Sequence, residues 1–317
     1  MNKIKSILFG ILEKALNFFG SLGINKKTPG AFRIYNFLFK HSWPYGDIIE
    51  IQGSKMYVNI RDEPSYSIRK TFEFYASNRI HEKATTELFK KTVKEGNVVI
   101  DLGANIGYFS LLAARFVGKN GKVYSFEPEP KNYSYLIKNI KLNNYDNVIA
   151  IQKAVSNKIG KTKLYICSYD AGHHTINQIE GIKAYRPEAI INEKDFVEIE
   201  TVTLDEFFKD KEDLIDVIKI DVEGAEVLTL AGMDRILKVN KKLKMFIEFF
   251  PLLIREMGNS PEEFIRKLSE NYGFSIFIIP DDYDAKEGEM VKINSAEELM
   301  GLCKDEKTHV NLFLKRT

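Results

Sequence analysis

Acidic residues and glycines gather at two places in the sequence where a short apolar run ends. The first place is the segment from Asp101 to Tyr108 and the second is the segment from Asp221 to Glu226. Glycine allows positive φ and close approach of a ligand, and asparagine tolerates the left-handed region better than most residues. Carboxylates accept protons and hydrogen bonds. We therefore expect turns and carboxylates to form a ligand site together.

The first turn does not fit the common phosphate-binding patterns. Counted from Gly103, the later glycine positions of G-x-G-x-x-G hold Asn105 and Tyr108, and no lysine follows before Lys119. The pattern Asp-x-Gly-x-Asn-x-Gly resembles the first motif of Rossmann-like methyltransferases that use S-adenosyl-L-methionine (SAM). The resemblance implies that the turn binds SAM through Asp101, Gly103, Ala104, Asn105, Gly107 and Tyr108. A tight turn whose glycines serve packing alone is the alternative.

Two features after the turn extend this predicted pocket. Glu127 follows the predicted strand 122–126, and an acidic residue at the end of a second strand commonly accepts hydrogen bonds from ribose hydroxyls. A carboxylate placed before a helix N-terminus is the alternative. Ala154 and Val155 follow the third predicted strand, 148–151. In the expected strand order this loop lies beside the adenine, although it can also be a plain connection.

The second acidic segment is predicted to lie near the reacting atoms. Methyl transfer to an oxygen needs the acceptor in line with the methyl group and needs the hydroxyl proton removed. Asp221 ends the predicted strand 214–220 at the same sheet edge as Asp101, so Asp221 is the first catalytic candidate and Glu223 the second. Glu223 and Glu226 can instead cap the following helix, where the dipole favours carboxylates.

Two histidines and a metal site are further candidates. His173 and His174 lie in the polar insertion 168–194, which is long for a connection and is predicted to form part of a substrate-binding cap. Histidine titrates near neutral pH, which suits proton removal, but two exposed loop histidines are the alternative. Asp221 and Glu248 end adjacent predicted strands, where some O-methyltransferases bind magnesium through carboxylates. A divalent metal is the less favoured possibility.

A sheet must bring these residues together. Predicted strands alternate with helices, which implies parallel βαβ units. The predicted fold class is α/β, a Rossmann-like doubly wound sheet, mostly parallel with an antiparallel edge strand, plus an N-terminal helical extension. We predict two domains, an extension at 1–68 and a methyltransferase domain at 69–317.

Residues 3–22 have the pattern of an amphipathic helix, with apolar residues on one face and lysines on others. Docking on the chain's own core or on a partner subunit is favoured, and association with a membrane surface is the alternative. Glu13 and Lys14 interrupt the apolar run, which argues against a signal peptide. The stretch is too short and polar to span a bilayer.

The composition is that of an ordinary globular protein. The chain has 317 residues, 44% hydrophobic and 28% charged, with a net charge of +2. This balance does not suggest a nucleic-acid partner. Cys167 and Cys303 form neither a zinc pattern nor a disulfide framework, so we predict a reducing compartment and a cytoplasmic protein, with membrane-peripheral association as the alternative.

Five segments together resemble FkbM-type SAM-dependent methyltransferases, over about residues 96–250. The segments are 98–108, Glu127-Pro128, 154–156, 202–205 and 218–226. The last is the most specific, because generic methyltransferases lack its Lys-x-Asp-x-Glu-Gly-x-Glu run. The resemblance implies methyl transfer from SAM to an oxygen of a saccharide, glycoconjugate or other small metabolite. N- or C-methylation, or a SAM-binding scaffold without catalysis, are the alternatives.

Overall fold

The computed structural model describes residues 11, 48–57, 80–167, 174–176, 195–211, 214–280, 289–303 and 308–316. The chain divides into two compact units, residues 1–79 and 80–317. In the first unit, β1 (Ile48–Ile51) and β2 (Ser54–Tyr57) form an antiparallel hairpin. The amphipathic helix predicted at 3–22 lies outside the described residues except for Ile11, which is helical. The boundary at 68 and the role of this helix stay predictions.

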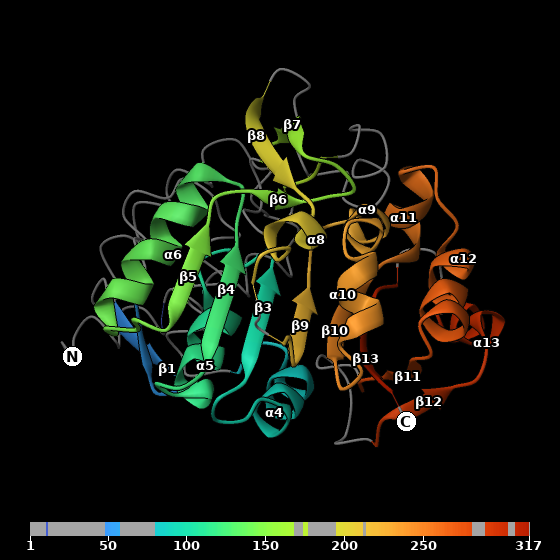
Figure 1. The fold of residues 1–317 in the computed structure, drawn as a ribbon, viewed down its shortest axis with the longest axis horizontal. Helices are drawn as coiled ribbons and strands as arrows, with labels where there is room; N and C mark the ends of the chain where they lie inside the picture. The colour runs from blue at the N-terminus through green and yellow to red at the C-terminus, as the bar shows by residue number, and fades with distance from the viewer. Residues whose placement is uncertain are drawn as a thin grey trace. The chain divides into compact units, whose positions relative to one another are not determined.

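The second unit is built on an eight-stranded sheet. In spatial order its strands are β12 (Val291–Ile293), β11 (Ser275–Ile278), β13 (Val310–Lys315), β10 (Lys244–Phe249), β9 (Val217–Ile220), β3 (Val98–Leu102), β4 (Lys122–Phe126) and β5 (Val148–Ile151). The five strands from β10 to β5 are parallel, and their carboxyl ends share one edge (Figure 1). The predicted antiparallel edge strand is present as β12, but a second antiparallel strand, β13, lies inside the sheet.

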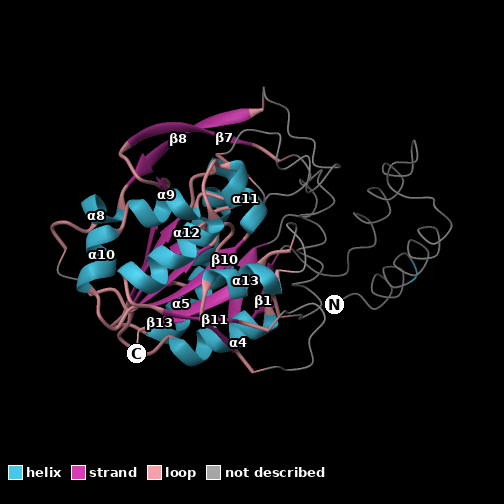
Figure 2. Cartoon of the chain, turned by 90° about the vertical axis from the view of Figure 1, so that its right-hand side faces the viewer, coloured by secondary structure: helices cyan, strands magenta, loops and turns pink. Residues whose placement is uncertain are grey.

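Helices cover both faces of this sheet, which confirms the predicted doubly wound α/β fold. They are α4 (Lys83–Thr92), α5 (Tyr108–Val117), α6 (Pro130–Leu142), α8 (Leu204–Phe207), α9 (Glu226–Ala231), α10 (Asp234–Val239), α11 (Pro251–Glu256), α12 (Pro261–Arg266), which continues into the π-helical turn Lys267–Asn271, and α13 (Ala296–Leu302). Figure 2 shows α8 and α10 on one side of the sheet. Among the described residues, no helix combines the length and apolarity required to cross a bilayer.

Strand alternation separates two environments on the two faces of the sheet. Ile100 and Leu102 of β3 are fully buried in the apolar cluster that includes residues of α8 to α13. Successive strand residues point to opposite faces, so Asp101 points to the other one. On that face Phe89 of α4 packs against Phe109 of α5 and Phe246 of β10, each at 5.3 Å between ring centroids. The site residues of β3 and β9 therefore lie against α4 and α5.

A small second sheet stands beyond the carboxyl ends of the parallel strands (Figure 1). It consists of β6 (Ala154–Val155), β8 (Phe196–Val202) and β7 (Gly160–Tyr165). Thr175, in the described part of the predicted cap, forms a bridge with Tyr165. The remainder of the predicted cap lies outside the described residues.

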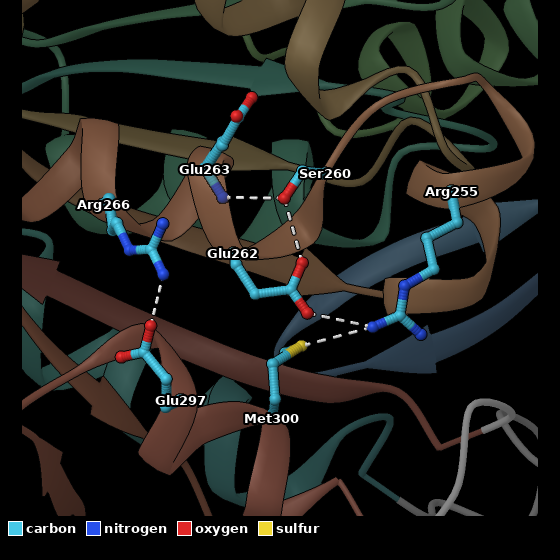
Figure 3. A network of polar contacts seen from close by, with 7 residues as sticks. All are labelled: Arg255, Ser260, Glu262, Glu263, Arg266, Glu297 and Met300. Carbon is cyan, nitrogen blue, oxygen red and sulfur yellow. Dashed lines mark hydrogen bonds and ion pairs between the residues drawn. The ribbon is translucent and has the colours of Figure 1, made fainter.

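Polar contacts join α11, α12 and α13 at the far end of the sheet from β5 (Figure 3). Ser260 caps α12 by accepting a hydrogen bond from the Glu263 backbone N–H at 3.1 Å. The Arg255 guanidinium reaches Glu262 at 3.0 Å and lies 4.0 Å from the sulfur of Met300. Arg266 pairs with Glu297. Exposed pairs of this kind each contribute about 0–1 kcal/mol, so the network fixes helix positions rather than dominating stability.

Candidate active site

The turn after β3 is held against both neighbouring strands. The backbone N–H groups of Gly103 and Ala104 both donate to the carbonyl of Phe126 at 3.0 Å, and the Asp221 N–H donates to Leu102 at 3.0 Å. Gly103 has φ +79°, and a Cβ there would lie 1.8 Å from the Asp221 carbonyl oxygen. Only glycine permits this approach, so the two predicted motifs meet backbone to backbone.

Glu127 links the turn to the start of α6. Its buried carboxyl group accepts hydrogen bonds from the Asn105 N–H at 2.8 Å and the Glu129 N–H at 2.9 Å. Burial raises the pKa of Glu127 to about 8, although these two hydrogen bonds oppose the shift. Each carboxyl oxygen keeps a second lone pair, which is the acceptor capacity that a pair of ribose hydroxyls requires.

The other predicted cofactor residues lie around the same edge. Asn105 and Gly107 take positive φ, at 50° and 103°. Ala104 is buried, and Tyr108 begins α5 with its hydroxyl 3.3 Å from the Thr86 hydroxyl. Ala154 and Val155 form β6, in the small sheet at this edge, and their adenine role stays a prediction.

A buried lysine sits between the two acidic motifs. The register of β3 and β9 places Lys219 beside Asp101, whose carboxyl group accepts from the Ser110 hydroxyl at 2.6 Å. The Lys219 ammonium lies 2.6 Å from Asp221 and 4.5 Å from the centroid of the Phe109 ring. Burial alone would lower the pKa of Lys219, but nearby carboxylates, Asp221 first, raise it. The ammonium is therefore charged and fixes the carboxylates around it.

Asp221 has two further acidic neighbours. One carboxylate oxygen from each of Asp221, Glu223 and Glu248 lies within 4.8 Å of the other two. Burial raises the pKa of Glu248, and the charges of Asp221 and Glu223 raise it further. Burial also disfavours the charged form of Asp221, but Lys219 and a hydrogen bond from Glu248 lower its pKa to about 2. Glu248 thus holds a proton and Asp221 a fixed negative charge.

The donor set of this acidic cluster has the chemistry that magnesium prefers, because all three ligands are oxygens. Glu223 would be a third ligand beside the predicted Asp221 and Glu248. A cation there would have to displace the proton of Glu248. The predicted metal site stays a prediction.

Glu226 begins α9 and accepts a hydrogen bond from the Gly224 N–H at 3.1 Å, in the turn that precedes the helix. The N-cap residue is Ala225, which has no capping side chain, so the capping interpretation stays a prediction. The other carboxyl oxygen of Glu226 is buried and makes no hydrogen bond with a described residue. Burial raises the pKa of Glu226 to about 8.

Glu226→Gln should remove a pH dependence of stability. A carboxyl group whose folded-state pKa is raised stabilises the fold fully below its unfolded pKa, and this contribution is lost as the pH rises toward 8. We expect the variant to gain about 1–3 kcal/mol over the wild type between pH 5 and pH 8. Urea unfolding at both values measures this difference. An equal difference at the two pH values would contradict the prediction.

The predicted histidines do not supply a proton acceptor among the described residues. His173 lies outside them. The Nδ1 atom of His174 accepts a hydrogen bond from the Cys167 N–H at 3.0 Å. A neutral imidazole has one acceptor nitrogen, so His174 then carries its proton on Nε2 and its lone pair is engaged. Its catalytic role stays a prediction, but this geometry argues against it.

A different histidine contacts the first residues of α5, which follow the turn. His81 and Glu82 precede α4, and the His81 ring packs against the Tyr108 ring at 5.2 Å between centroids. The sequence patterns did not indicate this pair as part of the site, because it belongs to no motif and to no glycine-rich turn. The only signal was the adjacency of a histidine and a glutamate just before the helix that leads into β3.

Comparison with known families decides the class of this site. The model of the methyltransferase FkbM domain matches residues 101–276. The chain belongs to the FkbM methyltransferase family. This membership confirms the predicted family, the methyltransferase class and SAM as the cofactor, and the match continues beyond the predicted limit at 250. The roles of individual residues stay predictions.

This FkbM-family chain is similar, at modest sequence identity, to proteins named as methyltransferases. It is 28% identical over 149 residues to Methyltransferase 1 of Beauveria bassiana, covering 44% of this chain and 59% of that protein. It is 31% identical over 156 residues to Methyltransferase sdnD of Sordaria araneosa, covering 43% and 60%. The chain thus spans about 60% of the length of these curated relatives. Its similarity to the crystal structure of methyltransferase FkbM from Methylobacillus flagellatus has a TM-score of 0.42 at 13% identity, covering 78% of this chain and 53% of that one.

Proposed function

We propose that this FkbM-family methyltransferase transfers the methyl group of SAM to a hydroxyl oxygen of a saccharide, glycoconjugate or other small metabolite. One observation supports SAM binding in this proposal. Asp101 and Glu127 are buried carboxyl groups at the ends of adjacent strands. Glu127 has no ion pair with any described residue. Ribose hydroxyls fit Glu127, and the ammonium group of SAM fits Asp101. When bound, SAM supplies a methyl group on a positively charged sulfur.

The acceptor side rests on the acidic cluster. Asp221, paired with Lys219, keeps its charge at neutral pH and can accept a hydrogen bond from an acceptor hydroxyl. A hydroxyl held in this way keeps a lone pair for the methyl group. An amine would pair with Asp221 as an ammonium ion and would lose the lone pair that N-methylation requires. This difference favours an oxygen acceptor over a nitrogen one.

The pKa of Asp221 also limits what this residue can do. An effective general base has a pKa near the working pH, and Asp221 is lowered to about 2. We therefore assign Asp221 to orientation and to electrostatic stabilisation near the positive sulfur, not to proton removal. The sequence predicts Asp221 as the first catalytic candidate, and the role proposed for it is other than that of the base.

Glu127→Gln tests the cofactor side. We expect the affinity for S-adenosylhomocysteine and for SAM to fall about 10–100-fold, because glutamine replaces one carboxyl oxygen by an NH₂ donor and leaves a ribose hydroxyl without its acceptor, a loss of about 1–3 kcal/mol. Isothermal titration measures both affinities, with the exposed Asp146→Asn as the matched control and urea unfolding as a check of folding. Wild-type affinity in the Glu127 variant would exclude this residue from the pocket. No binding to the wild type would overturn the proposed function.

A further inference from the structure

A cavity lies at the amino ends of the parallel strands, the edge of the sheet opposite the candidate active site. Its volume is about 460 Å³, which falls within the range of small-molecule pockets, about 300–1,000 Å³. The cavity is lined by the starts of β9 and β10, by the segment after α4 and by Arg316, which follows β13. Figure 1 shows this edge beside α4, at the opposite end of the strands from the small sheet of β6, β8 and β7. A ligand in this cavity would therefore lie away from the cofactor turn.

The wall of this cavity carries a concentrated positive charge. Five of its side chains are cationic and one is a carboxylate, whereas the whole chain has 46 basic and 44 acidic residues. The cationic residues are Lys94, Lys241, Lys242, Lys244 and Arg316. None of the five forms an ion pair with a described residue. Because like charges that lack counter-ions repel one another, an anion that enters the cavity is attracted by all of them.

Arg316 is fixed in an orientation that leaves some of its donors unused. Its Nε–H donates to the Tyr272 carbonyl at 2.9 Å, and a second N–H donates to the Asn240 carbonyl at 2.6 Å. A third N–H donates to the Leu237 carbonyl. A guanidinium has five N–H donors, so two remain. Burial lowers the pKa of Arg316, and no carboxylate among the described residues opposes this shift. A half-buried guanidinium that is held by carbonyl groups alone is stabilised by an anion.

Two neutral side chains add hydrogen-bond donors to the wall. Thr92 is 7% exposed, and its hydroxyl makes no hydrogen bond with a described residue. Asn97 accepts from the Lys94 N–H through Oδ1 at 2.8 Å, which leaves its NH₂ group for another partner. A wall of donors fits a ligand rich in acceptor oxygens, such as a phosphate group. The described residues that line the cavity include no aromatic side chain on which a nucleic-acid base could stack.

Asp216 supplies the one carboxylate among the described residues of the wall, and the fold uses this group. Its Oδ2 accepts from the Val98 N–H at 2.8 Å, and its backbone carbonyl accepts from the Lys244 N–H at 2.9 Å. Asp216 thereby joins the starts of β3, β9 and β10. Its charge offsets one of the five cations, so four positive charges remain without a counter-ion among the described residues.

We propose that this cavity is a second ligand site, which binds a small phosphorylated molecule through its phosphate groups. Lysine binds phosphate as a compact charge, and arginine offers paired N–H donors to its oxygens. The cations come from three separate segments of the chain, so a ligand with more than one phosphate charge suits them better than a single carboxylate does. This proposal does not depend on the acceptor of the methyl group.

Isothermal titration of inorganic pyrophosphate into the full-length protein at low ionic strength tests the site. We expect the wild type to bind pyrophosphate and the double variant Lys241→Gln/Lys244→Gln to bind it about tenfold more weakly, because two cations of the wall are lost. Asp216→Asn should instead strengthen binding about threefold, because it removes the opposing charge. Its side-chain oxygen can still accept the hydrogen bond from Val98.

The matched control is Lys158→Gln/Lys163→Gln, which removes two charges from exposed positions in and beside the small sheet. Its affinity for pyrophosphate should stay within about twofold of the wild type, because distant exposed charges are screened. Urea unfolding checks that each variant is folded.

Competition with the cofactor product gives a second readout. Saturating S-adenosylhomocysteine should leave the pyrophosphate affinity unchanged, since the two ligands bind at opposite edges of the sheet. Displacement of one ligand by the other, equal losses in the two double variants, or no binding of pyrophosphate to the wild type would each overturn the proposal. Failure of S-adenosylhomocysteine to bind would instead reject the proposed function and would leave the cationic cavity unaffected.

Vesicles of phosphatidylcholine with and without phosphatidic acid identify the source of the phosphate once pyrophosphate binding is established. Co-sedimentation with phosphatidic acid that decreases in Lys241→Gln/Lys244→Gln would assign the cavity to a lipid headgroup. Equal co-sedimentation of the wild type and this variant would assign it to a free phosphorylated compound.

Discussion

Lys219→Met should lower the free energy of unfolding by about 3–5 kcal/mol at pH 7, because it leaves buried carboxylates without their cation. The Lys219 side chain is 4% exposed, and its ammonium lies 2.6 Å from Asp221. Asp101 and Glu82 also act on this ammonium. Methionine fills a similar volume, so the loss measures charge rather than packing. The Lys219 side chain thus contributes both to the stability of the fold and to the charge balance of the candidate site.

The effect of Lys219→Met should depend on pH in a defined direction. The pKa of Asp221 is lowered to about 2 from its ordinary 3.8. Its contribution to stability is present above the ordinary value and is lost as the pH falls through the folded value. The wild type loses this contribution in acid and the variant has none to lose, so the difference between them should shrink below about pH 4. Urea unfolding from pH 3 to pH 7 measures it.

The control for Lys219 is a lysine in an exposed ion pair. Lys238 lies 2.7 Å from Asp234, with 64% of its side chain exposed. Lys238→Met should cost less than about 1 kcal/mol. Equal losses in the two variants would mean that Lys219 acts as an ordinary surface lysine, contrary to its burial.

Gly103→Ala should abolish measurable binding of S-adenosylhomocysteine, with a loss of more than about 100-fold, and should destabilise the protein by more than about 2 kcal/mol. A Cβ at this position would lie 1.8 Å from the Asp221 carbonyl oxygen. That atom belongs to the backbone at the end of β9, so it cannot move without displacing the strand end. The turn and the acidic segment would separate, and with them the two halves of the site.

A second glycine separates the steric clash from backbone strain. Gly258 has φ +74°, close to the +79° of Gly103, but a Cβ at Gly258 would meet nothing within 4 Å. Gly258→Ala should therefore cost only the left-handed strain, about 1–2 kcal/mol, and should leave ligand affinity intact. Titration and urea unfolding of both variants give the comparison. Similar results for the two glycines would show that the contact with Asp221 has no special importance.

The sequence predicted those parts of the site that depend on local order. Residue types along a buried parallel strand determine where the strand ends, and in such sheets all carboxyl ends meet at one edge. The turn at 101–108, Glu127 and Asp221 could therefore be placed at the same edge before any coordinates were known. The start of a helix after the second acidic segment followed from the same local logic, because the helix dipole favours carboxylates there.

The sequence could not predict contacts that depend on tertiary register. Lys219 lies beside Asp101 because β9 pairs with β3, although more than a hundred residues separate them in the chain. The proton on Glu248 depends on its distance from Asp221 and on burial, which no pattern encodes. The contact between the rings of His81 and Tyr108 arises only because the fold brings the start of α5 beside the residues that precede α4. For the same reason, the sequence predicted an antiparallel edge strand but not the antiparallel strand β13 inside the sheet.

The place of β13 has a consequence for the order in which the protein assembles during synthesis. This strand is hydrogen-bonded to β10 on one side and to β11 on the other. Both neighbours leave the ribosome before it, so they have no partner at that seam until residues 310–315 emerge. Until then each presents an open strand edge of the kind that pairs with other chains. A nascent chain of this protein thus exposes two open strand edges shortly before β13 is made, when the residues of the glycine-rich turn after β3 have long been synthesised.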